Sequence, residues 1–214
     1  MPSKAHQKAV KAINRDGLIL VFPIDNKKSP HSIWYELHPR TAMRWEWDED
    51  GDSKVADLWR LRAELSTSRE VVYTKWFRNR ATYFSKDLFT ACLCLSLQNP
   101  RTLTHEAREI LEALQMDSPL STRQLKESVQ LQGRLLESLF NKSMKQLWDS
   151  FQIVAFGEVE DSSFPSLAVG ATQNIFEELW LAAKEMSPST AQKLIDEKMP
   201  PGSPWRRYWD RLKI

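Results

Sequence analysis

Hydrophobic positions repeat at helical spacing through the middle of the chain. Residues 106–116 place apolar side chains three or four positions apart, which predicts an amphipathic helix that ends before Pro119. A second, shorter helix is expected over residues 122–129, and Gly133 suits the corner that follows it. Residues 134–151 predict a third helix. The positions expected to face the core on this third helix are Leu135, Leu136, Leu139, Phe140, Met144, Leu147 and Trp148.

After the third helix the pattern changes from helical spacing to alternation. Residues 153–159 alternate between two faces, as a strand does, and a polar tip separates them from a returning strand through Leu167 and Val169. Three helices followed by a hairpin is the order of a winged helix-turn-helix. We therefore expect a winged helix-turn-helix over residues 100–172. The alternative is an unrelated α+β core with the same order of elements.

The N-terminal part combines amphipathic helices with short apolar strands. Residues 4–15 predict a helix, residues 18–23 a fully apolar strand, and residues 54–65 another helix. Residues 71–85 alternate, which predicts either a hairpin or a strand that leads into a helix. Residues 86–97 are apolar and helical, and an Asn-Pro pair then marks a boundary.

The C-terminal part is expected to be helical throughout. Helices are predicted over residues 174–186, 190–198 and 204–213, separated by serine, proline and glycine. The chain thus divides into three units: an N-terminal winged-helix-like α+β unit (residues 1–99), the winged helix-turn-helix, and a C-terminal helical extension (residues 173–214). The expected fold class is α+β and helix-rich.

The composition of the 214-residue chain is that of an ordinary globular protein, with 42% hydrophobic and 27% charged residues. Nine tryptophans against only six glycines favour large packed side chains. No apolar run approaches the roughly 20 residues that a membrane span needs, and the basic N-terminus lacks the apolar core of a secretory signal. Cys92 and Cys94 are expected to be reduced and buried, so we expect a cytoplasmic protein with no membrane partner.

The net charge of +2 conceals an uneven distribution. Residues 1–15, 69–86 and 198–214 each carry a net charge of +4, whereas acidic residues concentrate in residues 46–57 and around the hairpin tip. Such segregation permits a basic face for the phosphate backbone of a nucleic acid. The alternative is scattered charge that only meets solvent.

Side chains suited to DNA occur in two places, the alternating segment and the polar face of the third helix. The candidate nucleic-acid-binding residues are Lys75, Arg78, Arg80, Arg134, Asn141, Lys142 and Lys145. These types reach phosphates and base edges from a helix in the major groove. The same positions also fit a solvated helix face, and the cations of residues 75–80 could instead pair with the acids of residues 46–57. Glu158, Glu160 and Asp161 make the wing acidic, which favours a protein partner over a phosphate backbone there.

Motifs for metals and cofactors are incomplete. Residues 46–51 resemble the front half of a calcium-binding EF-hand loop, but the later ligand positions depart from that motif, so an acidic turn is expected. His31 and His38 lie seven residues apart and lack a third metal ligand. The chain has no phosphate-binding loop, dinucleotide-binding motif or nucleophile elbow. We therefore expect no metal and no cofactor.

Three stretches carry a resemblance to a known family: residues 17–25, residues 73–82 and the expected winged helix through residues 157–160. They resemble the AlkZ-type DNA glycosylase superfamily, and within it the shorter AlkZ-related branch. The Lys-x-x-x-x-Arg-Ala-Thr run over residues 75–82 is the most specific part. The resemblance implies winged-helix units that cup double-stranded DNA, and in the glycosylases themselves it implies removal of alkylated or crosslinked bases.

The resemblance also points to a catalytic position. Those enzymes carry a Gln-x-Gln or Gln-x-Asp pair after the N-terminal strand, where it positions water at the anomeric carbon. Pro23, Ile24 and Asp25 occupy that place here, so Asp25 matches the acid and a proline replaces the first glutamine. Residues 130–132 also spell Gln-Leu-Gln, but they lie in the expected helix-turn-helix corner.

Three functions are therefore open. The first is a DNA-binding protein, related to repair glycosylases and lacking catalysis. The second is an active glycosylase that uses Asp25 to activate water. The third is a winged helix that binds a protein through its acidic wing. We expect the first, with double-stranded DNA as the partner.

Overall fold

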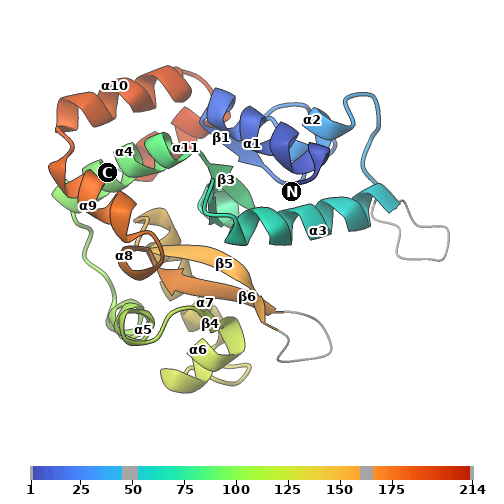
Figure 1. Ribbon diagram of the computed structural model, residues 1–214. Helices are drawn as coiled ribbons and strands as arrows, with labels where there is room; N and C mark the ends of the chain where they lie inside the picture. The colour runs from blue at the N-terminus through green and yellow to red at the C-terminus, as the bar shows by residue number, and fades with distance from the viewer. Residues whose placement is uncertain (1, 45–52, 160–165, 213–214) are drawn as a thin grey trace.

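In the part of the chain that the structure describes, six short strands form one antiparallel sheet at the centre of the molecule (Figure 1). In chain order they are β1 (Leu18–Leu20), β2 (Val72–Thr74), β3 (Thr82–Phe84), β4 (Leu120–Ser121), β5 (Ile153–Val159) and β6 (Ser166–Ala171). Their order across the sheet is β1-β3-β2-β5-β6-β4. The computed structural model describes residues 2–44, 53–159 and 166–212 of the chain.

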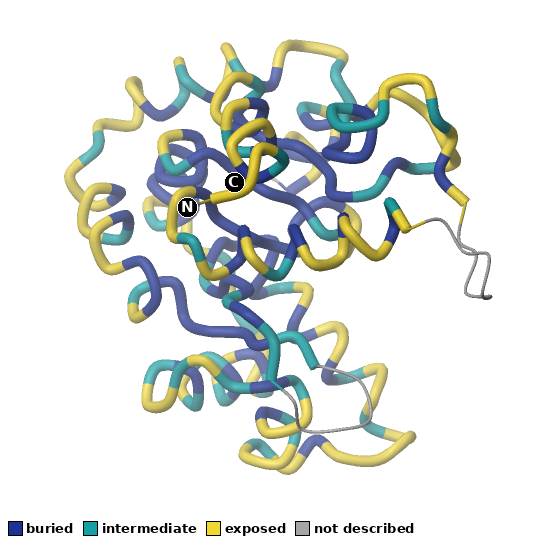
Figure 2. Tube along the Cα trace, turned by 45° about the vertical axis from the view of Figure 1, so that its right-hand side comes forward, coloured by how far each residue is buried: buried dark blue, intermediate teal, exposed yellow. Residues whose placement is uncertain are grey.

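Helices cover both faces of this sheet. One layer contains α1 (Lys4–Asp16), α2 (Ile33–Leu37), α3 (Ser53–Thr67), α5 (His105–Met116), α6 (Thr122–Ser128) and α7 (Glu137–Asp149). The opposite layer contains α4 (Lys86–Gln98), α8 (Thr172–Ile175), α9 (Glu177–Glu185), α10 (Pro188–Lys198) and α11 (Pro204–Leu212). Buried residues follow the centre of the molecule, and exposed residues lie on the outer sides of the helices (Figure 2). The fold is therefore helix-rich α+β, as the sequence predicts.

The strands read as continuous apolar runs because both sheet faces are covered. Successive side chains of a strand point to opposite faces. In β1, Leu18 and Leu20 belong to the core under α4 and α11, whereas Ile19 belongs to the core under α1 and α3. In β2, Val72 and Tyr73 divide between the two cores in the same way. Both cores are therefore built on one sheet.

Polar side chains fix where several helices begin. An N-cap hydroxyl accepts a hydrogen bond from a backbone N–H of the first turn, which otherwise has no partner. The capping residues are Ser3, Ser32, Ser85, Thr104, Ser121 and Ser187. Ser121 also forms a capping box with Gln124, so the cap expected at Ser121 or Thr122 lies at Ser121.

The sheet is continuous between the first two expected units. Strand β2 pairs with β5 through Tyr73 and Ala155, which joins the β2–β3 hairpin to the β5–β6 hairpin. Residues of all three expected units contribute to the core that includes Trp76, Phe151 and Trp209. The boundaries of the three units stay a prediction.

Two expected helices differ from the structure. The single helix predicted over residues 174–186 is divided into α8 and α9, because Phe176 leaves helical geometry (φ −127°, ψ 59°) and buries its ring against Phe156. The third helix begins at Glu137 rather than at residue 134, after a turn in which the N–H of Leu136 donates to the carbonyl of Gly133.

The prediction that Leu135 faces the core is wrong, because its side chain is 95% exposed. Leu135 lies in the turn between Gly133 and Leu136, before α7 begins, so it does not take the inward position that a continuous helix would give it. The remaining predicted positions agree with the structure. Leu136 and Leu139 pack partly against the core, and Phe140, Met144, Leu147 and Trp148 are buried.

Two further expectations concern the whole chain. Cys92 and Cys94 are free thiols in the buried interior of α4, as predicted. No helix among the described residues is long and apolar enough to cross a membrane. The EF-hand-like residues 46–51 lie outside the described residues. In the described part of the chain, no group of three metal-ligating side chains occurs.

Candidate nucleic-acid interface

Strand β2 leads into a tight turn that carries two of the predicted binding residues. The segment 71–85 is a hairpin, and the backbone N–H of Arg80 donates to the carbonyl of Phe77 at 3.0 Å across its tip. Arg78 (φ 52°) and Asn79 (φ 57°) both lie in the left-handed region, which is the geometry of a type I′ turn. Asparagine tolerates this region, but arginine is placed there at a cost of roughly 1–2 kcal/mol. The turn holds Arg78, Asn79 and Arg80 at the surface.

An open cleft lies between this turn and the polar face of α7. Its volume is about 600 Å³. Its lining residues are Asn79, Arg134, Glu137, Ser138, Asn141, Lys142 and Lys145. Four of the seven predicted binding residues, namely those of the third helix, therefore meet Asn79 in one cleft.

Three cations from different elements gather around a pair of aromatic rings beside the cleft. The rings of Phe77 and Tyr208 have their centroids 5.1 Å apart. The guanidinium of Arg78 lies 5.1 Å from the centroid of Phe77. Lys145 of α7 and Arg211 of α11 lie 5.8 Å and 5.5 Å from the centroid of Tyr208. The structure thus brings Arg78 and Lys145 together, and α11 adds a third cation to them.

Lys145 is tied to a buried carboxylate at the edge of the cleft. Its ammonium group pairs with Asp149 one turn further along α7, and it donates to the hydroxyl of Tyr208 at 3.3 Å. The hydroxyl of Tyr208 in turn donates to Asp149 at 2.9 Å. Burial lowers the pKa of Lys145, but the hydrogen bond to Asp149 and its charge outweigh burial and raise that pKa above its ordinary value. Lys145 therefore stays protonated, with part of its charge offset by Asp149.

The one acid that lines the cleft is also compensated. Glu137 forms a 2.5 Å ion pair with Lys126 of α6, and the hydrogen bond from Lys126 lowers the pKa of Glu137. Lys126 also lies 4.9 Å from the ring centroid of Phe140, which fixes α6 against α7. Among the residues that the structure describes, Arg134 and Lys142 have no carboxylate partner. The cleft therefore presents net positive charge.

Lys75 does not join this group. It is half-buried, and burial together with the charge of Arg62 lowers its pKa below the ordinary value of 10.5. The expected alternative, pairing of Lys75, Arg78 and Arg80 with the acids of residues 46–57, is not seen among the described residues. The described acid Asp57 pairs with Arg60 instead. Residues 45–52 lie outside the described part of the chain.

Asp25, the predicted catalytic residue, lies on a second type I′ turn. The N–H of Lys27 donates to the carbonyl of Ile24 at 2.9 Å, and Asp25 and Asn26 have φ values of 51° and 52°. The side chain of Asn26 holds the turn by two hydrogen bonds to the backbone of Met43, at 2.7 Å and 2.9 Å. The carboxylate of Asp25 is exposed and does not line the cleft of α7.

The two turns nevertheless lie at the same end of the sheet. Strands β1 and β2 are both antiparallel to β3, which lies between them, so their carboxyl ends face the same way. Two strands separated by a third are about 10 Å apart. Asp25 follows β1 and Arg78 follows β2, so the same end of the sheet carries the predicted acid and the predicted phosphate contacts of turn 77–80.

Of the three acids predicted for the wing, the structure describes Glu158. Glu158 of β5 pairs with Arg62 of α3, and both side chains are largely buried. Its charge is therefore used inside the fold. Glu160 and Asp161 lie outside the described residues.

The two histidines of the metal proposal also have other contacts. His31 shares a 2.7 Å hydrogen bond with Asp16, and the ring centroid of His38 lies 4.9 Å from that of Trp34.

Sequence reasoning missed three contributors to the interface: Asn79, Tyr208 and Arg211. Asn79 stands between two predicted cations, and its left-handed backbone is a turn signal that asparagine often carries. The net charge of +4 in residues 198–214 marked the C-terminal helix as basic. Only the packing of α11 on Phe77 and α7 shows that this helix belongs to the same surface.

The chain matches a known family over nearly its whole length. A family model described as "AlkZ related" matches residues 4–205. The match includes Asp25, the turn 77–80 and α7, whereas Tyr208 and Arg211 lie just beyond it. No curated protein and no solved structure matches the chain.

Proposed function

The chain belongs to the AlkZ-related family, and from this premise we propose that it binds double-stranded DNA at the cleft between turn 77–80 and α7. The observation that carries the proposal is the gathering of exposed cations from three separate elements around one open cleft. The family is related to AlkZ-type DNA repair proteins. A surface of this kind fits the phosphate backbone of a duplex better than a small anion, because its cations are spread along a face.

The elements around the cleft fit a winged helix-turn-helix. Helices α5, α6 and α7 are followed by the β5–β6 hairpin, and β4 pairs with β6 to close the small sheet. In such a unit α7 is the recognition helix. Its polar face offers Ser138 and Asn141 between Arg134 and Lys142, so hydrogen-bonding groups for base edges lie between cations for phosphates.

Charge compensation answers part of the objection to a phosphate partner, for the acids that the structure describes. Glu137 pairs with Lys126, and Glu158 pairs with Arg62, so neither acid confronts DNA as a free charge. Lys145 is partly neutralised by Asp149 and contributes less than the other cations. Five exposed cations in and around the cleft have no carboxylate partner among the described residues: Arg134 and Lys142, which line it, and Arg78, Arg80 and Arg211 of the neighbouring turn and α11.

These five cations set the expected salt dependence. If each contacts one phosphate, the slope of log affinity against log salt concentration is about −4.5. Raising the salt from about 50 to about 200 mM then weakens binding roughly 500-fold. The double variant Arg78→Ala/Lys142→Ala should make the slope shallower by about 1.8.

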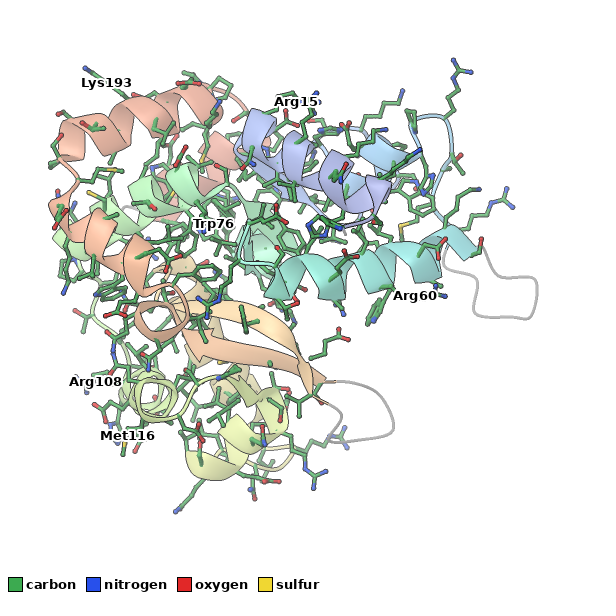
Figure 3. The ribbon with its side chains drawn as sticks, viewed as in Figure 1. Arg15, Arg60, Trp76, Arg108, Met116 and Lys193 are labelled. Carbon is green, nitrogen blue, oxygen red and sulfur yellow. The ribbon has the colours of Figure 1, made fainter. Side chains whose placement is uncertain are left out.

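Fluorescence anisotropy with a labelled duplex at several salt concentrations measures these slopes. The matched control is Arg108→Ala/Lys193→Ala, which removes the same two charge types from α5 and α10, where both side chains point outward (Figure 3). The control should keep the slope of the unmodified protein. Equal slopes for the two double variants, or binding that does not respond to salt, would rule out the proposed surface.

A further inference from the structure

Leu135 is the most exposed of the large hydrophobic side chains described in the structure. It is 95% exposed, compared with 90% for Met116, 50% for Leu181 and 38% for Trp59. A single exposed leucine is ordinary on a protein surface and by itself indicates nothing. Leu135 differs from such a residue because an ordered turn holds it next to the cations of the cleft.

The turn that carries Leu135 is fixed from both sides. The N–H of Leu136 donates to the carbonyl of Gly133 at 3.1 Å, and Leu136 packs against the core. The carbonyl of Leu136 then accepts from Phe140 at 2.9 Å, which joins the turn to the first turn of α7. Leu135 is therefore held outward by ordered backbone, because the residue after it is anchored in the core.

The neighbours of Leu135 are cations and polar groups of the cleft. Arg134 precedes it and lines the cleft. Ser138 and Lys142 follow in the first two turns of α7, and both line the cleft. A protein partner usually needs a contiguous apolar patch, whereas Leu135 is a single apolar group in a charged rim. Duplex DNA matches both features of this surface. Its phosphates suit the cations, and its stacked bases offer an interior that an apolar side chain can enter.

We propose that Leu135 is a wedge that enters the base stack of the duplex bound at this cleft. Apolar side chains of this size are inserted between base steps by proteins that kink or open DNA. Unstacking costs least where a base pair is mismatched or damaged. The preferred ligand is therefore a duplex with a weakened base pair. This inference rests on the proposed function, since the phosphate contacts must first hold the duplex.

The test places 2-aminopurine beside a mismatch, because its fluorescence rises when the base leaves the stack. Anisotropy of a second label on the same duplex reports binding separately. The unmodified protein should raise the fluorescence and should favour the mismatched over the matched duplex, on the order of tenfold. Leu135→Ala should bind the matched duplex as before, lose the rise in fluorescence and lose most of the preference.

Two further variants make the result specific. Leu135→Met keeps a flexible apolar side chain and should retain the rise in fluorescence. Leu181→Ala removes the same side chain from α9 in the opposite helical layer and should change neither signal. A rise that persists in Leu135→Ala would overturn the wedge, and so would tight binding by the unmodified protein with no rise. Absence of any duplex binding would instead overturn the proposed function itself, and the wedge with it.

Discussion

The pair of Arg62 and Glu158 offers the sharpest test of how the fold is held together. Arg62 lies in the middle of α3, and Glu158 lies on β5 beyond the bulge at Gly157. Their side chains are only 10% and 15% exposed. Arg62 also stacks on the ring of Trp59, at 3.9 Å from its centroid. We predict that Glu158→Ala destabilises the protein strongly, because it leaves the guanidinium buried without its partner.

The magnitude follows from the burial of both groups. Removing one partner of a buried ion pair costs about 3–5 kcal/mol. Because this pair keeps some contact with water, we expect about 3 kcal/mol for Glu158→Ala, at the lower end of that range. Arg62→Met should cost a similar amount, since it leaves Glu158 unpaired and removes a stacking contact of about 0.5–1 kcal/mol. The double variant Arg62→Met/Glu158→Ala should cost clearly less than the sum of the two single changes.

Urea denaturation of the four proteins in this cycle measures the coupling free energy. Neighbouring groups that interact show coupling of about 0.5–3 kcal/mol, and we expect a value in the upper half of that range. A parallel cycle on the exposed pair Arg60 and Asp57, in the same helix α3, should give near zero. Additive costs at Arg62 and Glu158 would show that the two charges do not stabilise each other, and that the carboxylate of Glu158 is free for another partner.

Three other predictions test the core, a buried charge and catalysis. Trp148→Ala should cost about 3–5 kcal/mol of unfolding free energy in denaturant, because the side chain is only 4% exposed; a near-neutral change would contradict its place in the core. Lys75→Met should stabilise the protein at pH 7, because the lowered pKa of Lys75 means that its charged form is disfavoured in the fold. The gain in unfolding free energy should shrink as the pH rises through the folded pKa towards 10.5. A gain that does not change with pH would refute this cause. The protein should release no base from alkylated or crosslinked duplexes, and release that disappears in Asp25→Ala would show the opposite.

The local elements of this fold could be predicted because they depend on local patterns. Helix α7 could be recognised from Phe140, Met144, Leu147 and Trp148, which recur at helical spacing and are all buried. The start of that helix could not be predicted, because Leu135 has the residue type of a core position but lies in the turn that precedes the helix. Its exposure follows from the turn at Gly133, which sets where the helix begins.

Pairing between distant segments could not be predicted from the same patterns. Strand β2 meets β5 through Tyr73 and Ala155, which are 82 residues apart in the chain. Alternation of apolar and polar residues shows that a segment is a strand with an apolar face, but it does not identify the strand that pairs with it. The same limit explains why Arg211 was missed. Its charge was visible, but its position beside Lys145 depends on the contact of Tyr208 with Asp149.

The candidate interface shows why a chain with a net charge of +2 can still present a basic surface. Overall charge counts every acid equally, whereas the field at a surface depends on which acids remain free of partners. Here Glu137 and Glu158 are occupied by Lys126 and Arg62, cations that do not line the cleft. Of the cations that do line it, Arg134 and Lys142 have no carboxylate partner among the described residues, whereas Lys145 pairs with Asp149. It follows that freeing either acid should weaken the binding of a polyanion, because a negative charge then returns to the cleft, in the case of Glu137, or to the β5–β6 hairpin, in the case of Glu158.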